Sequence, residues 1–494
     1  MSEIRTDVLI VGGGTGGVAA ALAACDLDKR VVMTEPTPWL GGQLTSQAVP
    51  PDEHRWIEQF GCTASYRRFR EGVRQYYRDH YPLTDAARRD PHLNPGGGDV
   101  SRLCFEPRVG VAVIDAMLAA HRASGRLMVL HGIEPVDVDT VKGKVRHVGF
   151  SDGSHVSADM LLDATELGDL LPLAKAAYTI GSEAQSEFGE PDAPSVGDVE
   201  DVQSFTWVAA IDHDPDHPRP IKKPASYDRW LAEPQPDVPD GRLIDWQYTR
   251  PTDAFSGRGS LFEEEGAYSL FRYRQVVDDL QWQIGVTDVS LLNWPQNDYA
   301  GGRVVDVPAE LAKQRLAEAK ELTRCVVYWL QQQEPGIRLR PDMLGTNDGF
   351  ALAPYHREGR RIRARFTITQ QHVAAKCRPD GKAEVFADSV GVGAYRMDLH
   401  PSASGRSSMY AEVCPFQIPM HALLPADGPS NLIAAAKNIG TTHLTNGCYR
   451  LHPIEWNIGE AAGVMAAVGT DVATVQDVLR KRGVELAWPT IGIF

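Results

Sequence analysis

The stretch Asp7–Gly17 reads DVLIVGGGTGG and decides the fold. Its first five residues are β-prone, and an alanine-rich helical pattern follows the glycines up to about Cys25. A second β-prone segment, Arg30–Thr34, ends in the acid Glu35. A strand, G-x-G-x-x-G, a helix, a second strand and an acid in this order are the fingerprint of a dinucleotide-binding Rossmann unit.

Each glycine of the fingerprint has its own task. Gly12 permits a tight turn, Gly14 lets the backbone approach a pyrophosphate, and Gly17 lets the helix pack closely on the strand. The free N–H groups at the helix start favour phosphate oxygens, and Glu35 stands where a carboxylate can accept ribose hydroxyls. The fingerprint therefore predicts cofactor contacts from Gly12, Gly14, Thr15, Gly16, Gly17 and Glu35.

A glycine pair shortly after Glu35 favours FAD over NAD. Pro36–Thr45 reads PTPWLGGQLT, and this resembles the loop that runs along the flavin in two-domain FAD proteins of the glutathione reductase and succinate dehydrogenase type. A second complete fingerprint is missing, because Gly391–Gly393 lacks the third glycine and the helix. A separate NAD(P)H domain is therefore not expected. The glycine-pair loop adds predicted cofactor contacts from Gly41, Gly42, Gln43 and Leu44.

Four further blocks carry a resemblance to a known family. They are Leu161–Asp169 (LLDATELGD), Asn293–Tyr299 (NWPQNDY), Tyr355–Ile362 (YHREGRRI) and Asn431–Ala467. With them the chain resembles, over nearly its whole length, the bacterial FAD-dependent oxidoreductases that have a single Rossmann domain and are related to succinate dehydrogenase and fumarate reductase flavoproteins. The resemblance implies FAD, which some relatives attach covalently through a histidine. Nothing in this sequence identifies such a histidine, so non-covalent binding is expected. One departure is Glu166, where the family has glycine.

The resemblance also implies contacts outside the fingerprint. The block after the strand Leu161–Ala164 would lie under the adenosine. Pro135 has no N–H to offer the adenine, so the contact would come from Val136 or be lost. Asn438–Tyr449 is interpreted as a polar loop that leads into a helix over Glu455–Ala467, and the start of this helix would stabilise negative charge on the flavin. The added contacts are Val136, Ala164, Thr165, Asn438, Pro453 and Asn457.

The expected fold is α/β, with a Rossmann-like, glutathione reductase-type FAD-binding domain and an inserted α+β substrate domain. The FAD domain would be discontinuous, over residues 1–175 and 385–472. The insertion would span 176–384, and 473–494 would form a packing tail.

Three shorter elements can also be predicted from the pattern. A long helix is expected from Pro308 to about Gln333. Alternating residues predict strands over Gln281–Leu292 and over Arg360–Thr369, and Val475–Val484 is expected to form a short packing helix.

Flavin chemistry needs side chains that bind the substrate and move a proton. The favoured candidates are the cluster in the polar segment before the flavin-facing helix, His443, Asn446, Arg450 and His452. His54 follows the glycine-pair loop. Glu106 could act as a carboxylate beside the substrate, and Arg360 and Arg361 could bind a substrate carboxylate through two hydrogen bonds. Each has a structural alternative. For the cluster in the polar segment it is support of the backbone, and for His54 an exposed polar turn. For Glu106 it is a helix-start acid that interacts with the helix dipole, and for Arg360 and Arg361 a solvated strand edge or an ion pair.

Composition limits the remaining possibilities. The 494 residues carry 65 acids and 50 bases, a formal charge of −15, which opposes nucleic-acid binding. Seven scattered cysteines form no metal-ligand or C-x-x-C spacing, so no metal site is expected, and they fit a reducing cytoplasm. Val8–Ala24 is apolar but holds three successive glycines, and no other stretch approaches a membrane span, so a soluble protein is expected.

These observations favour an FAD-dependent oxidoreductase that oxidises a small polar organic substrate and is reoxidised by oxygen or another acceptor. A flavin-dependent reductase or monooxygenase is an alternative within the same class. A tRNA-modifying flavoprotein or a non-catalytic flavin-binding protein are alternatives from other classes. The sequence does not identify the substrate, the electron acceptor or the oligomeric state.

Overall fold

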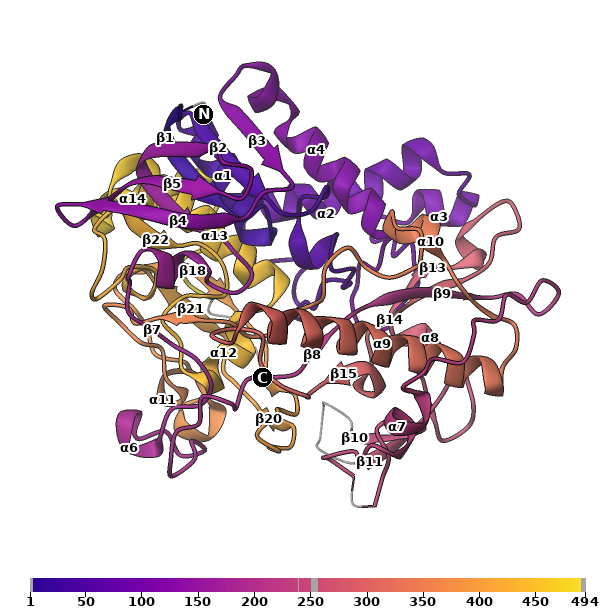
Figure 1. Ribbon diagram of the computed structural model, residues 1–494. Coiled ribbons are helices and arrows are strands. Elements are labelled where there is room, and N and C mark those ends of the chain that lie inside the picture. The colour runs from indigo at the N-terminus through magenta and orange to yellow at the C-terminus, as the bar shows by residue number, and fades with distance from the viewer. Residues whose placement is uncertain (1–2, 239, 250–255, 490–494) are drawn as a thin grey trace.

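The computed structural model describes residues 3–238, 240–249 and 256–489. Its largest sheet has the strand order β3-β2-β1-β6-β5-β4, and β22 pairs with β6 (Figure 1). The strands β2, β1, β3, β6 and β22 run parallel to their neighbours in this group, whereas β4 and β5 form an antiparallel extension. The bounds are β1 (Glu3–Val11), β2 (Val31–Glu35), β3 (Leu127–His131), β4 (Pro135–Val141), β5 (Lys144–Phe150), β6 (His155–Asp163) and β22 (Leu432–Ala434).

Two helices next to the parallel strands pack against each other. The helix α1 (Thr15–Asp26) follows β1, and α13 (His452–Val468) packs against it although the two are far apart in the sequence (Figure 1). A β-carbon added to Gly459 would overlap the carbonyl oxygen of Gly16, so the two backbones touch. The helix α4 (Pro107–Ala123) contacts β3, and α2 (Ala64–His80) packs on α4. The helix α14 (Val472–Lys481) packs on α13, and α12 (His443–Tyr449) packs on the later strand β19 (Met397–Leu399).

A second, smaller sheet lies outside the Rossmann unit. Its strand order is β13-β14-β9-β16, and the long helix α9 packs on it. The predicted long helix is confirmed, because α9 spans Ala309–Gln333. The strands of this sheet are β9 (Ala209–His213), β13 (Gln275–Val277), β14 (Val289–Leu292) and β16 (Ile337–Leu339). The segments β18 (Ser389–Gly393), β19 (Met397–Leu399), β20 (Met409–Ala411) and β21 (Phe416–Pro419) form two further ladders.

Three predicted elements differ from the structure. The segment predicted as a loop over Asn438–Tyr449 ends in the helix α12, which Thr442 caps by accepting a hydrogen bond from the Thr445 N–H. Within Gln281–Leu292 only β14 is a strand. Within Arg360–Thr369 only β17 (Arg361–Ile362) is a strand, because it pairs with just the two residues of β7 (Tyr178–Thr179).

The carboxy-terminal region is helical, as expected. The predicted helix over Glu455–Ala467 is confirmed as α13, and the predicted tail helix is α14, which starts earlier because Asp471 caps it. Among the described residues, no single helix has the length and apolar character to cross a membrane, and only the sharply bent pair α13 and α14 meets both criteria together. The proposed domain boundaries stay a prediction.

Candidate functional site

A cavity of about 520 Å³ opens at the carboxyl ends of β1, β2 and β6. Ligands of open α/β sheets bind at this edge, and the volume lies within the usual range of small-molecule sites. Six of the predicted cofactor contacts line the cavity, namely Gly12, Gly14, Glu35, Gly42, Ala164 and Thr165. At its rim Pro135 lines the cavity, while the side chain of Val136 is exposed.

The glycine loop forms the floor of this cavity. Gly12 has φ +103°, and a β-carbon there would overlap the carbonyl group of Ala164. A β-carbon on Gly17 would overlap the Gly12 carbonyl oxygen, so the helix packs on the strand as closely as the fingerprint requires. Gly14 is the N-cap of α1 and supplies no capping side chain. The N–H groups at the start of α1 are therefore available to an anionic ligand.

Glu35 is held rigidly at the end of β2. Its carboxylate accepts hydrogen bonds from the Gly13 N–H at 3.0 Å and from the N–H and hydroxyl of Thr37 at 3.0 and 2.6 Å. Burial raises the pKa of Glu35 to about 7, although these hydrogen bonds oppose the shift. A fixed acid at this position suits the ribose hydroxyls of a dinucleotide.

Glu166 stands directly in front of the glycine loop. Its Oε2 pairs with the Lys437 ammonium, and its Oε1 is buried without a partner among the residues that the structure describes. A β-carbon on Gly14 or on Gly42 would lie 2.8 or 2.7 Å from that free oxygen. Burial opposes ionisation, but Lys437 holds the pKa of Glu166 below its usual value. This ion pair therefore lies where the fingerprint would place a pyrophosphate.

The glycine-pair loop joins the cavity to a buried polar region. The amide nitrogen of Gln43 donates to the Arg450 carbonyl oxygen at 3.0 Å and to a Glu455 carboxylate oxygen. The side-chain oxygen of Gln43 and the other carboxylate oxygen of Glu455 are buried without a partner in the described structure. Gln43 and Leu44 lie in the short helix η1 (Gly42–Leu44), which follows Gly41 at φ +110°. The polar region thus begins one residue beyond the cavity wall at Gly42.

Three other predicted contacts hold the fold together around this region. Asn438 donates to the Asp163 carbonyl oxygen at 3.1 Å and so ties its segment to β6. Asn457 bridges the backbone of β18, accepting from the Val392 N–H and donating to the Val390 carbonyl oxygen. Pro453 lies in the first turn of α13, where its missing N–H costs nothing. A direct contact of these residues with a cofactor stays a prediction.

The structure brings only part of the predicted catalytic set to the polar region. Arg450 lies in it, and its Nη1 donates to the Tyr355 hydroxyl at 2.5 Å. His443 is seven residues from Arg450 in the sequence and is also buried, but it pairs elsewhere: its Nδ1 lies 3.0 Å from a Glu358 carboxylate oxygen. Its Nε2 has no hydrogen-bond partner among the described residues. Tyr355 was not predicted from the sequence, yet it stands between Pro354 and His356, which both line the cavity.

None of His443, Arg450, His54, Glu106 and Arg361 is among the residues that line the cavity. Arg361 is fully buried and paired with Glu183 at 2.7 Å and with Glu358, while its neighbour Arg360 lines the cavity. Glu106 accepts a hydrogen bond from the Tyr77 hydroxyl at 3.0 Å.

His54 was weighed as an exposed turn residue, but it is buried. Its Nε2 lies 3.0 Å from the Gly61 carbonyl oxygen, and burial lowers its pKa to about 4. The imidazole therefore stays uncharged and supports the loop.

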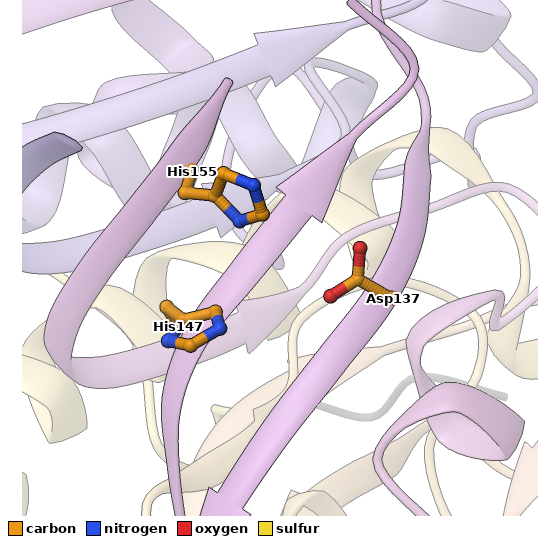
Figure 2. Close-up of side chains that lie close together, drawn as sticks. All are labelled: Asp137, His147 and His155. Carbon is orange, nitrogen blue, oxygen red and sulfur yellow. The ribbon is translucent and has the colours of Figure 1, made fainter. Parts of the chain in front are cut away.

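One group of side chains has the composition of a metal site. Figure 2 shows Asp137 of β4, His147 of β5 and His155 of β6 facing one another, and their ligand atoms lie within 4.8 Å of one another. Two imidazoles and a carboxylate suit a divalent transition metal. Asp137 is exposed and none of the three lines the cavity. The chemistry of the cavity therefore does not involve them, and the expectation of no metal stays untested.

The sequence model of the FAD dependent oxidoreductase family matches residues 7–485. The chain belongs to this family. It is accordingly an FAD-dependent oxidoreductase with a Rossmann-type fold. Three features described above fit the cofactor: the glycines on the floor of the cavity, the available N–H groups at the start of α1, and the hydrogen-bonded carboxylate of Glu35. A search of curated proteins found no match.

Solved structures resemble this FAD-dependent oxidoreductase over limited segments. An L-proline dehydrogenase from P. horikoshii is 14% identical, with 37% of this chain and 25% of that chain covered and a TM-score of 0.20. A myxobacterial chondrochloren halogenase is 13% identical, with 44% and 45% covered and a TM-score of 0.25. A cyclohexanone monooxygenase is 12% identical, with 34% and 28% covered and a TM-score of 0.21. The chain thus spans less than half the length of these relatives.

Replacing Glu166 by glutamine is expected to tighten FAD binding. The variant removes a carboxylate that faces Gly14 and Gly42 and frees Lys437 to neutralise the pyrophosphate. We expect the Kd for FAD to fall about tenfold, equivalent to about 1.4 kcal/mol, in a fluorescence titration of the apoprotein. Glu134→Gln, at an exposed carboxylate that also lines the cavity, should change the Kd little. An unchanged or weaker Kd for Glu166→Gln would contradict this role.

Proposed function

We propose that the FAD-dependent oxidoreductase dehydrogenates a small polar organic molecule and is reoxidised by oxygen or another acceptor. When bound, FAD supplies the site that accepts a hydride. The observation that carries the proposal is the set of buried polar atoms beside the cavity that lack partners in the described structure: Gln43 Oε1, Arg450 Nε, His452 Nε2 and Glu455 Oε1. Buried polar atoms are normally paired, so this set supports a polar ligand at this place.

His452 is suited to hold a substrate oxygen. Its Nδ1 accepts the Asp52 N–H at 3.0 Å, which assigns the ring proton to Nε2. Burial, reinforced by the positive charges of Arg274 and Arg450, lowers the pKa of His452 to about 3. The imidazole is therefore neutral at pH 7, and its free Nε2–H can donate a hydrogen bond to an oxygen of the substrate.

The visible absorption spectrum of the purified protein is the first test. We expect two oxidised-flavin bands that remain after gel filtration and that bleach anaerobically with a polar organic reductant from a substrate panel. A protein that stays colourless after addition of FAD would overturn the proposal. Release of the flavin by acid denaturation would support the proposed non-covalent attachment.

The same holoprotein separates the alternatives. Rapid NADPH oxidation without another substrate would favour a reductase or monooxygenase, and a flavin that no small molecule reduces would favour a non-catalytic flavoprotein. A shift of tRNA mobility at low salt would favour the tRNA-modifying class, which the charge of −15 opposes. A cytoplasmic, bacterial setting and a relation to the succinate dehydrogenase and fumarate reductase flavoproteins belong to the same proposal.

A further inference from the structure

Three arginines from separate parts of the chain gather around Asp52 and Asp398. Arg274 follows the short helix α8 (Leu270–Tyr273), Arg396 lies between β18 and β19, and Arg450 ends α12. Arg274 lies 3.9 Å from Asp52 and Arg450 lies 3.7 Å from Asp398. Arg396 stands two residues before Asp398 and interacts electrostatically with both acids. We call Arg274, Arg396 and Arg450 the arginine cluster.

The arginine cluster has hydrogen-bond donors without acceptors. Arg274 is 8% exposed, yet neither its Nε nor its Nη1 has a partner among the residues that the structure describes. The Nε atoms of Arg396 and Arg450 are likewise buried and unpaired in that part of the chain. A buried guanidinium donor that pairs with nothing is costly, so unpaired donors on all three arginines indicate an acceptor that the protein itself does not supply.

The charges of this region do not balance. Two carboxylates face the three guanidinium groups: Asp52 lies 3.9 Å from Arg274, beyond hydrogen-bond distance, and Asp398 lies 3.7 Å from Arg450. Asp398 is also 3.7 Å from His400. With His452 neutral, three guanidinium groups face two carboxylates, a formal excess of one positive charge that matches a singly charged anion.

The position of the arginine cluster connects it to the redox site. Arg450 donates to Tyr355, whose neighbours on both sides line the cavity, and its carbonyl oxygen accepts from Gln43, next to Gly42. The Asp52 N–H donates to His452. Arg450 therefore lies at the buried polar region next to Gly42, and Asp52 links Arg274 to His452 in the same region.

The surroundings of the arginine cluster are aromatic. The guanidinium group of Arg274 lies 4.9 Å from the ring centre of Tyr273, and that of Arg396 lies 5.2 Å from the ring centre of Tyr395. Such rings hold a guanidinium group in place and also offer apolar contact to an organic ligand.

We propose that the arginine cluster binds a carboxylate of the substrate, so that the substrate is an organic acid. This inference rests on the proposed oxidoreductase function and names its substrate class. The planar guanidinium fork matches a carboxylate in geometry, and the single excess positive charge favours a monoanion over a doubly charged phosphate. His452 Nε2–H would then donate to the same substrate from the side of the glycine-pair loop.

Binding of sodium benzoate to the FAD-loaded protein tests the proposal. Benzoate carries a planar carboxylate on an aromatic ring, and benzamide is its neutral counterpart. We expect benzoate to bind at least about tenfold more tightly than benzamide, by calorimetry and by a shift of the flavin spectrum. Arg274→Gln should abolish this preference, and Arg274→Lys should restore part of it because the charge returns without the fork. Arg272→Gln, an exposed neighbour paired with Asp99 and Glu263, should leave it unchanged.

Several outcomes would overturn the proposal. These are equal binding of benzoate and benzamide, an unaltered preference in folded Arg274→Gln, or stronger competition by sodium phosphate than by benzoate. Arg396→Gln, at a partly exposed position, repeats the test if Arg274→Gln does not fold. Failure of the proposed function can be told apart from failure of this proposal, because calorimetry detects benzoate binding even in a protein that holds no flavin. A holoprotein with normal flavin bands but no benzoate preference would disprove the arginine cluster's role alone.

Discussion

Replacing Arg361 by leucine is expected to destabilise the protein by about 3–5 kcal/mol, the usual cost of removing one partner from a buried ion pair. The Arg361 side chain is fully buried, and it pairs with Glu358 and with Glu183 at 2.7 Å. Its guanidinium group also donates to the Thr441 carbonyl oxygen at 3.2 Å. Without Arg361 both carboxylates would remain buried with less compensation. Glu358 would keep His443, which lies 3.0 Å from it.

Arg363 provides a matched control two residues away. Its side chain is 59% exposed and lies 3.7 Å from Glu187, an ion pair of little energetic value. Arg363→Leu should change the free energy of unfolding by less than about 0.5 kcal/mol. Denaturant unfolding of both holoprotein variants measures the difference. A stable Arg361→Leu protein with an impaired substrate interaction would instead restore the interpretation of Arg361 as a substrate-binding residue.

This contrast shows what the sequence could not provide. The alternating pattern over Arg360–Thr369 predicted arginines on one side of an exposed strand, but it carries no record of Glu183 or Glu358 folding over Arg361. By comparison, the fingerprint around Gly12 and Glu35 could be predicted because its glycines, helix start and acid act within a short segment. A site formed by residues close together in the chain can be predicted from a single sequence. The burial of a charged side chain cannot, because it depends on residues far away in the chain.

The arginine cluster illustrates the same limit for the site. Arg450 could be predicted because it lies in a polar segment directly before a helix. Arg274 follows a helix of only one turn, and Arg396 follows a short strand, so neither carried a distinguishing local signal. Lys437 was missed although it follows the buried strand β22, where a charged residue just beyond an apolar run marks the sheet edge that holds the ligand.

Gly459→Ala is expected to cost about 3 kcal/mol, at the upper end of the usual range for a methyl group forced into a packed interior. The added carbon would overlap the carbonyl oxygen of Gly16, and its nearest neighbours are all backbone atoms of that residue. Backbone cannot rotate away as a side chain can, so α1 would have to move away from α13. The start of α1 forms the floor of the cofactor cavity, and we therefore expect FAD affinity to fall together with the melting temperature.

The direction of this effect separates packing from helix propensity. Alanine is favoured over glycine inside a helix by about 1 kcal/mol, so propensity alone would make Gly459→Ala more stable. Gly285→Ala is the control, since a β-carbon there meets no atom within 4 Å in the described structure. Thermal unfolding and an FAD titration of both variants decide the matter. A stabilised Gly459→Ala protein that binds FAD normally would mean that α1 and α13 have room to separate. The contact between their backbones would then not fix the position of the phosphate-binding turn.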